Sequence, residues 1–311
     1  MRFGIFGFGV ECDIPLPELP RSARRADVRV RARNVHPARR RWTSVEENHD
    51  IDGRPWLTIG RHGDDWLLRF PRFADFEVRD GGRTILARTR AGVPPNTIRH
   101  LLVDSVLPLA LSALGHLLLH ASGVAGRSGS VLFVGGTGTG KSTLAATFAG
   151  PLRPFTDDAV RVTERNGAFI ARGAYPGARL WPDAVAVLGS RPAARPVAHY
   201  TEKRRIALAA PRAGRTIRVI YVLQAAPAAS VTIRRCTRRA ALVSVLSHAY
   251  RLDPADRDVS RRHLDLVTSL SAAVPVFTLA FPENLERIRD VRDAVADHVT
   301  SITAESKAHG R

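Results

Sequence analysis

The chain has 311 residues, and 44% of them are hydrophobic, which allows one large domain or two ordinary ones and excludes a disordered protein. Its formal net charge of +18 comes mostly from arginine, because only Lys141, Lys203 and Lys307 among the 47 basic residues are lysines. The basic residues are scattered, apart from a denser run from Arg21 to Arg41. That run has no interleaved aromatic side chains on which the bases of a single strand could stack, which disfavours nucleic acid as a partner. An acidic peptide or a phosphate-bearing partner would suit the positive field equally well.

The two cysteines, Cys12 and Cys236, fit no metal spacing and are too few for a disulfide scaffold, which favours a reducing, cytoplasmic compartment. No secretory signal is visible, since glycines and Glu11 interrupt the apolar residues at the start. The longest apolar stretch, residues 101–119, contains Asp104 and is barely long enough to span a membrane. We therefore expect a buried helix and no membrane partner.

Short aromatic or β-branched runs separated by turn residues predict a smaller, mostly β domain over residues 1–95. The expected strands cover residues 56–59, 66–70, 76–79 and 84–88. Pro94 and Pro95 mark the boundary, because two prolines continue neither a strand nor a helix. A long apolar helix is then expected from Thr97 to about Leu119.

Strands that alternate with helices predict an α/β domain over residues 96–303, followed by a flexible tail over residues 304–311. The expected strands cover residues 121–125, 131–134, 217–223, 231–234 and 276–281, with a further strand ending at residues 155–156. The expected helices cover residues 141–149, 238–250, 254–272 and 284–299.

Residues 131–143 read Val-Leu-Phe-Val-Gly-Gly-Thr-Gly-Thr-Gly-Lys-Ser-Thr, which is the whole Walker A pattern between a strand and a helix. The glycines let backbone N–H groups turn toward phosphate oxygens, and the positive end of the dipole of the following helix points at the same phosphates. Lys141 is expected to reach the β- and γ-phosphates of ATP, and the Ser142 hydroxyl to ligate Mg²⁺. A glycine-rich turn without a ligand is the alternative. The predicted nucleotide-binding residues are Gly135, Gly136, Thr137, Gly138, Thr139, Gly140, Lys141, Ser142 and Thr143.

Asp157 and Asp158 follow the short strand after the loop's helix, where the carboxyl ends of parallel strands line ligand sites. One carboxylate can hold Mg²⁺ while the other acts as a base, and a pair that caps a turn is the alternative. His120 precedes the strands that lead into the loop, and an imidazole beside a catalytic carboxylate can orient it. Taken alone, such a histidine is more often a core or surface residue.

Together, His120-Ala-Ser-Gly-Val, Gly-Gly-Thr-Gly-Thr-Gly-Lys-Ser and Thr-Asp157-Asp158 resemble the catalytic domain of HPr kinase/phosphorylase, over about residues 115–300. The resemblance implies a P-loop-containing HPr-kinase-like domain that follows the β domain along the chain. It also implies Asp157 as general base, His120 as the partner of Asp157, and Asp158 as a helper near Mg²⁺. Which aspartate is the base and which assists Mg²⁺ stays open.

Two further stretches, within residues 6–19 and 175–182, are similar to bacterial HPr-kinase-like proteins such as lasso-peptide precursor kinases, which phosphorylate a C-terminal serine. The glycine-rich signature of true HPr kinases is not found near residues 172–182, so neither the HPr role nor the phosphorylase reaction follows. Lys203, Arg204 and Arg205 form a basic cluster that could close over the γ-phosphate or the acceptor. A solvated charge run is the alternative, and it is favoured for Arg205.

These features predict an ATP-dependent kinase that phosphorylates a serine of a peptide or small protein, with the C-terminal serine of a lasso precursor as one acceptor. A P-loop ATPase, a small-molecule kinase and a basic nucleic-acid-binding module are the alternatives. The sequence leaves open the acceptor, the role of the β domain, the reverse reaction, and whether the chain forms a homo-oligomer.

Overall fold

The computed structural model describes residues 1–33, 41–50, 52–175, 177–188, 194–207, 214–225 and 230–308. Contacts divide the chain into two compact units. The first comprises Met1–Leu118, Pro196–Glu202 and Tyr250–Arg262, and the second comprises Leu119–Arg195, Lys203–Ala249 and His263–Arg311. Residues 96–118 therefore group with the N-terminal strands, whereas we expected the boundary between residues 95 and 96.

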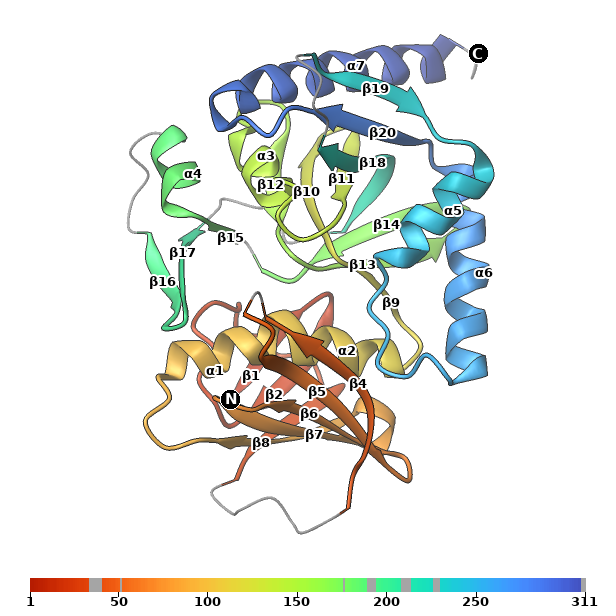
Figure 1. The fold of residues 1–311 in the computed structure, drawn as a ribbon. Helices are drawn as coiled ribbons and strands as arrows, with labels where there is room; N and C mark the ends of the chain where they lie inside the picture. The colour runs from red at the N-terminus through yellow and green to blue at the C-terminus, as the bar shows by residue number, and fades with distance from the viewer. Residues whose placement is uncertain are drawn as a thin grey trace. The chain divides into compact units, whose positions relative to one another are not determined.

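The first unit contains a sheet in the strand order β1-β2-β3-β8-β7-β6-β5-β4 (Figure 1). Its strands are β1 (Arg2–Ile5), β2 (Phe8–Cys12), β3 (Val28–Ala32), β4 (Thr43–His49), β5 (Pro55–His62), β6 (Asp65–Phe70), β7 (Ala74–Arg79) and β8 (Thr84–Thr89), with a 3₁₀ turn η1 (Asp80–Gly82). The four strands expected from the sequence are β5 to β8. Their hairpins pair antiparallel in unbroken registers, and buried positions such as Leu68, Phe76 and Ile85 form the core of this unit.

The apolar segment after Pro94 is a helix in three parts: α1 (Pro95–Leu101), a π-helical segment (Leu102–Val106) and α2 (Leu107–Ala113). The helix stops at Ala113, so the expected end near Leu119 was wrong. Gly115 adopts a φ of 84°, which side-chain-bearing residues rarely do, and β9 (Leu117–Leu119) follows it. The stretch is a buried core helix, and no helix within the described ranges is long and apolar enough to cross a membrane.

The second unit is built on a mixed sheet that contains the strand order β12-β10-β11-β18-β14-β13, with β20 beside β18 and β19 beside β20 (Figure 1). Its strands are β10 (Ala121–Gly126), β11 (Gly129–Val134), β12 (Arg153–Thr156), β13 (Val160–Arg165), β14 (Ala168–Gly173), β18 (Arg215–Ala225), β19 (Thr232–Arg235) and β20 (Val276–Phe281). Strands β11, β18 and β20 run parallel, whereas β10 pairs antiparallel with both of its neighbours. A separate sheet contains β15 (Gly177–Leu180), β16 (Arg195–Ala198) and β17 (Thr201–Ala207).

The helices in the rest of the chain are α3 (Lys141–Thr147), α4 (Pro182–Val187), α5 (Arg238–Ser247), α6 (Arg257–Ala273) and α7 (Ile288–Ala308), with a 3₁₀ turn η3 (Leu285–Arg287) before α7. Helices α3 and α7 cover the parallel strands through one buried cluster that includes Phe133, Leu144, Tyr221 and Val295. Helix α7 continues to Ala308, past residue 304, where we expected a flexible tail to begin. Burial of this cluster holds the strand–loop–helix segment around residues 129–147 in place.

Candidate active site

The predicted phosphate-binding loop, residues 135–140, connects β11 to α3. Gly135, Gly138 and Gly140 adopt φ values of 155°, 87° and 84°, which favour glycine. A Cβ added at Gly135 would lie 2.9 Å from the Thr139 Oγ1 and 3.0 Å from the Leu223 carbonyl oxygen. The turn therefore requires glycine at its first position for space as well as for conformation.

Lys141, the first residue of α3, is only 6% exposed. Its Nζ donates hydrogen bonds to the carbonyl oxygens of Gly135, at 2.9 Å, and Gly136, at 2.8 Å. Burial lowers the pKa of Lys141, while the charges of Asp158 and Asp157 act to raise it. The ammonium therefore sits inside the loop and within electrostatic reach of both predicted aspartates.

The two aspartates and His120 meet because of an antiparallel pair of strands. We expected the strand before Asp157 to run parallel to its neighbour, and this was wrong: β12 runs antiparallel to β10, with Gly123 opposite Thr156. Antiparallel pairing places the first residue of one strand beside the last residue of the other. His120, just before β10, therefore lies close to the residues that follow β12.

Asp157 is 3% exposed, and both of its carboxylate oxygens accept hydrogen bonds. Oδ1 accepts from the Ser122 hydroxyl at 2.7 Å, and Oδ2 accepts from the backbone N–H of Arg179 at 2.9 Å. The side chain is thus fixed between β10 and β15 rather than presented to solvent.

Asp158 is the more accessible carboxylate, with 25% of its side chain exposed, and it adopts a φ of 69°. Its Oδ2 lies 2.5 Å from the Arg179 Nη2, and its Oδ1 lies 3.3 Å from the His120 Nε2. We expected His120 to pair with Asp157, but the structure pairs it with Asp158. Burial acts to raise the pKa of Asp158, but the Arg179 guanidinium and the His120 imidazole outweigh it and hold the pKa well below its ordinary value.

Arg179 on β15 binds both aspartates, and sequence reasoning did not select it. It is 7% exposed, with its backbone N–H on Asp157 and its guanidinium on Asp158. In a chain this rich in arginine the residue type alone carries little information. The available signal was its position inside residues 175–182, the stretch that resembles HPr-kinase-like proteins.

The basic cluster on β17 divides between the site and its surroundings. The Lys203 Nζ lies 5.2 Å from the centroid of the Trp181 ring. Burial lowers the pKa of Lys203, and Arg179 adds to this, whereas the two aspartates oppose it, so Lys203 belongs to the same charged cluster. Arg204 pairs through its backbone with Leu180, and the Arg205 guanidinium lies 5.1 Å from the Tyr175 ring. Arg204 therefore contacts β15, and Arg205 contacts β15 and the residue Tyr175 before it.

Ser142 and Thr143 follow Lys141 in the first turn of α3, and both are partly exposed. Within the described part of the chain, no group of three or more His, Cys, Asp and Glu side chains could hold a metal by itself. A metal in this site would therefore need oxygen ligands from a bound phosphate and from water in addition to those of the chain.

No protein-family model matches the chain, and no curated protein matches it. Among solved structures, the HPr(Ser) kinase/phosphatase from Coxiella burnetii aligns over 62% of this chain and 96% of its own, with a TM-score of 0.34 and 12% identity. At that TM-score the likeness decides neither the fold nor the function of this chain.

Proposed function

We propose that the chain is an ATP-dependent kinase that transfers the γ-phosphate to a serine hydroxyl of a peptide or small protein. The observation that carries the proposal is the convergence of Lys141, the paired aspartates and Lys203 in one unit, each within electrostatic reach of the others. Phosphoryl transfer depends on cations that neutralise the phosphates and a carboxylate that orients the attacking hydroxyl, and this cluster contains both.

Binding of ATP with Mg²⁺ is supported by the loop and by the oxygen donors beside it. The turn at Gly135 leaves no space for a Cβ, as expected where backbone N–H groups must approach a phosphate closely. The Ser142 hydroxyl would hold Mg²⁺ together with phosphate oxygens and water. Mg²⁺ held there would supply positive charge against the negative charge that develops on the phosphates during transfer.

We assign the contact with the acceptor hydroxyl to Asp158. The resemblance implies Asp157 as general base, but the side chain of Asp157 is buried, whereas a quarter of the Asp158 side chain is exposed. Asp158 is ionised throughout the neutral range because its pKa is held low, so it can accept a hydrogen bond from an incoming hydroxyl. In this account Asp157 is a positioning residue that fixes Ser122 and Arg179.

Lys203 and Arg179 would supply positive charge beside the aspartates, in addition to the charge of Lys141. The cation–π contact with Trp181 gives the Lys203 side chain a preferred place beside the aspartates. From there its ammonium would meet the γ-phosphate as it leaves ATP, when three oxygens carry the developing charge.

The experiment is to incubate the full-length protein with Mg²⁺, γ-labelled ATP and serine-containing peptides, including peptides that end in serine, as the resemblance implies. Matched peptides with alanine in place of serine are the control. We expect label on serine and none on alanine. Release of free phosphate at the same rate with every peptide would instead indicate an ATPase without an acceptor.

A further inference from the structure

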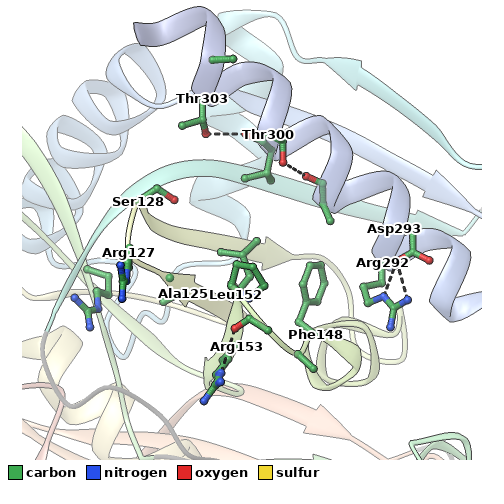
Figure 2. Close-up of a pocket in the computed structure, with 18 residues that line it drawn as sticks. Ala125, Arg127, Ser128, Phe148, Leu152, Arg153, Arg292, Asp293, Thr300 and Thr303 are labelled. Atoms are coloured by element: carbon green, nitrogen blue, oxygen red, sulfur yellow. Dashed lines mark hydrogen bonds and ion pairs between the residues drawn. The ribbon is translucent and has the colours of Figure 1, made fainter.

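The second unit contains a large pocket at the end of the β10–β11 hairpin that lies away from the phosphate-binding loop. It has a volume of about 1370 Å³ and lies between the turn at residues 126–128, the segment 148–153 and residues 292–304 of α7 (Figure 2). Gly126 pairs with Gly129 at this end, whereas Ala121 pairs with Val134 at the end that leads into the loop. The length of β11, about 17 Å at ~3.3 Å per residue, separates the pocket from the loop.

The polar part of the pocket is strongly cationic. Arg127, Arg153, Arg215 and Arg292 line it, and Asp293 is the one carboxylate among the lining residues that the structure describes. Asp293 is already paired with Arg292 at 2.7 Å. The other three arginines make no ion pair with a carboxylate among the described residues.

Arg215 and Arg153 line the pocket in different ways. The Nε of Arg215 is buried and has no hydrogen-bond partner among the described residues. Arg153, in contrast, uses its Nε on the Gly150 carbonyl oxygen at 3.2 Å, which leaves the rest of its guanidinium available.

The remaining wall is apolar. Phe148, Leu152, Ala296 and Val299 line the pocket, and they pack against the core of the second unit from α7 and from the segment after α3. In Figure 2, Leu152 and Phe148 lie between Arg127 and Arg153 on one side and Arg292 on the other. A ligand that complements the whole pocket would therefore combine apolar surface with more than one negative charge.

We infer that this pocket binds an acidic peptide segment of a partner protein, with an apolar side chain over Leu152 and carboxylates at Arg127, Arg153 and Arg215. The pocket is larger than the roughly 300–1,000 Å³ of typical small-molecule sites. A compact phosphate would meet the arginines but leave the apolar wall uncovered. A peptide with alternating acidic and apolar side chains satisfies both surfaces, and recognition of acidic motifs by arginine clusters is a recurring mode.

The test is fluorescence anisotropy with the full-length protein and a labelled peptide in which glutamates alternate with leucines. Its matched control is the same peptide with every glutamate replaced by glutamine. We expect saturable binding of the acidic peptide that weakens as salt rises, and affinity for the glutamine peptide at least about tenfold lower. Equal binding of the two peptides would overturn the inference.

Variants locate the binding. Arg127→Glu/Arg153→Glu should weaken binding of the acidic peptide at least about tenfold, because attraction becomes repulsion. Thr300→Trp should also weaken it, since the new ring would enter the pocket from an exposed position on α7. Arg165→Glu, at an exposed arginine outside the pocket, should change it less than about twofold. Thermal melts and ATP binding check that each variant is folded.

Full binding by both pocket variants would contradict the proposed site.

A competition experiment with inorganic polyphosphate completes the test, because polyphosphate offers negative charge without apolar surface. We expect it to compete only weakly with the peptide. Tight binding of polyphosphate with no binding of the peptide would show a simple anion site and overturn the inference.

Discussion

The Nη2 of Arg179 lies 2.5 Å from the Oδ2 of Asp158, and the backbone N–H of the same arginine donates to Asp157. One residue of β15 thus holds two adjacent carboxylates that would otherwise repel each other in a largely buried place. The position of β15 therefore sets the position of the whole acidic pair.

Replacement of Arg179 by methionine should destabilise the fold at pH 7 by about 2–3 kcal/mol, because it leaves Asp158 without its strongest cationic partner in a partly exposed site. The ionised Asp158 adds to the free energy of unfolding at pH values above the ordinary aspartate pKa near 4. This stabilisation is lost as the pH falls toward the lowered pKa of Asp158 in the folded state. Urea unfolding should therefore show a gap between wild type and variant that narrows below about pH 4. Arg165→Met, at an exposed position, is the control, and a gap of the same size for both variants would contradict this role.

The two aspartates should respond differently to the change to asparagine. Asp158→Asn should lower the rate of label transfer by at least about 100-fold while ATP binding changes little, because the acceptor hydroxyl loses its carboxylate. Asp157→Asn should mainly lower the melting temperature, since its buried oxygens hold Ser122 and Arg179. The measurements are transfer rates, calorimetric ATP affinity and thermal melts. Normal transfer by the Asp158 variant together with loss in the Asp157 variant would return the base to Asp157.

Two lysines of the site allow a matched comparison of binding with transfer. Lys141→Ala should weaken ATP affinity by at least about tenfold, because a buried cation–phosphate contact is lost. Lys203→Ala should leave ATP affinity within about threefold and lower the transfer rate, because its charge acts on the departing phosphate. Calorimetry and label transfer separate the two effects. Identical losses of affinity would contradict the division of roles.

Glycines of the loop differ in what an added methyl group would meet. Gly135→Ala should weaken ATP binding and lower the melting temperature, because the new Cβ would lie 2.9 Å from the Thr139 Oγ1 and 3.0 Å from a backbone oxygen. At Gly138 nothing lies within 4 Å of such a Cβ, so only its φ of 87° opposes alanine, at a cost of about 1–2 kcal/mol. The ranking is tested by ATP titrations and thermal melts of both variants. A larger effect at Gly138 than at Gly135 would contradict the crowding seen at Gly135.

His248 should remain neutral in the folded protein down to about pH 4. Burial lowers its pKa from 6.5 to about 4, with further contributions from His120 and Lys141. The unfolded chain binds the proton more readily, so the free energy of unfolding should fall as the pH drops from about 6.5 to about 4. His248→Gln should flatten this part of the profile, which denaturant titrations at several pH values measure. An unchanged slope in that variant would assign the pH dependence to other groups.

The local parts of this structure were predictable and the long-range parts were not. The strand, loop and helix around Lys141 follow from a contiguous pattern, and β20 occupies residues 276–281 as expected because a short apolar run defines it. The pairing of His120 with Asp158 depends on the antiparallel register of β10 and β12, which a sequence pattern does not specify. The end of α2 at Ala113 was missed because Gly115 interrupts an otherwise continuous apolar run.

The role of Arg179 in the candidate site also depends on a long-range contact that the sequence did not predict. The aspartates stand next to each other in sequence, but their cation comes from another sheet, more than twenty positions later in the chain. The backbone N–H of Arg179 also donates a hydrogen bond to Asp157, and a pattern of side chains in the sequence cannot predict a backbone contact of this kind.

The most direct test of the central claim is a crystal structure of the protein with Mg²⁺ and a non-hydrolysable ATP analogue. We predict that the triphosphate lies in the loop of residues 135–140 with Lys141 on its outer phosphates, and that Asp158 faces the γ-phosphoryl group with room for one hydroxyl between them. An analogue bound elsewhere, or a γ-phosphoryl group turned away from both aspartates, would contradict the account.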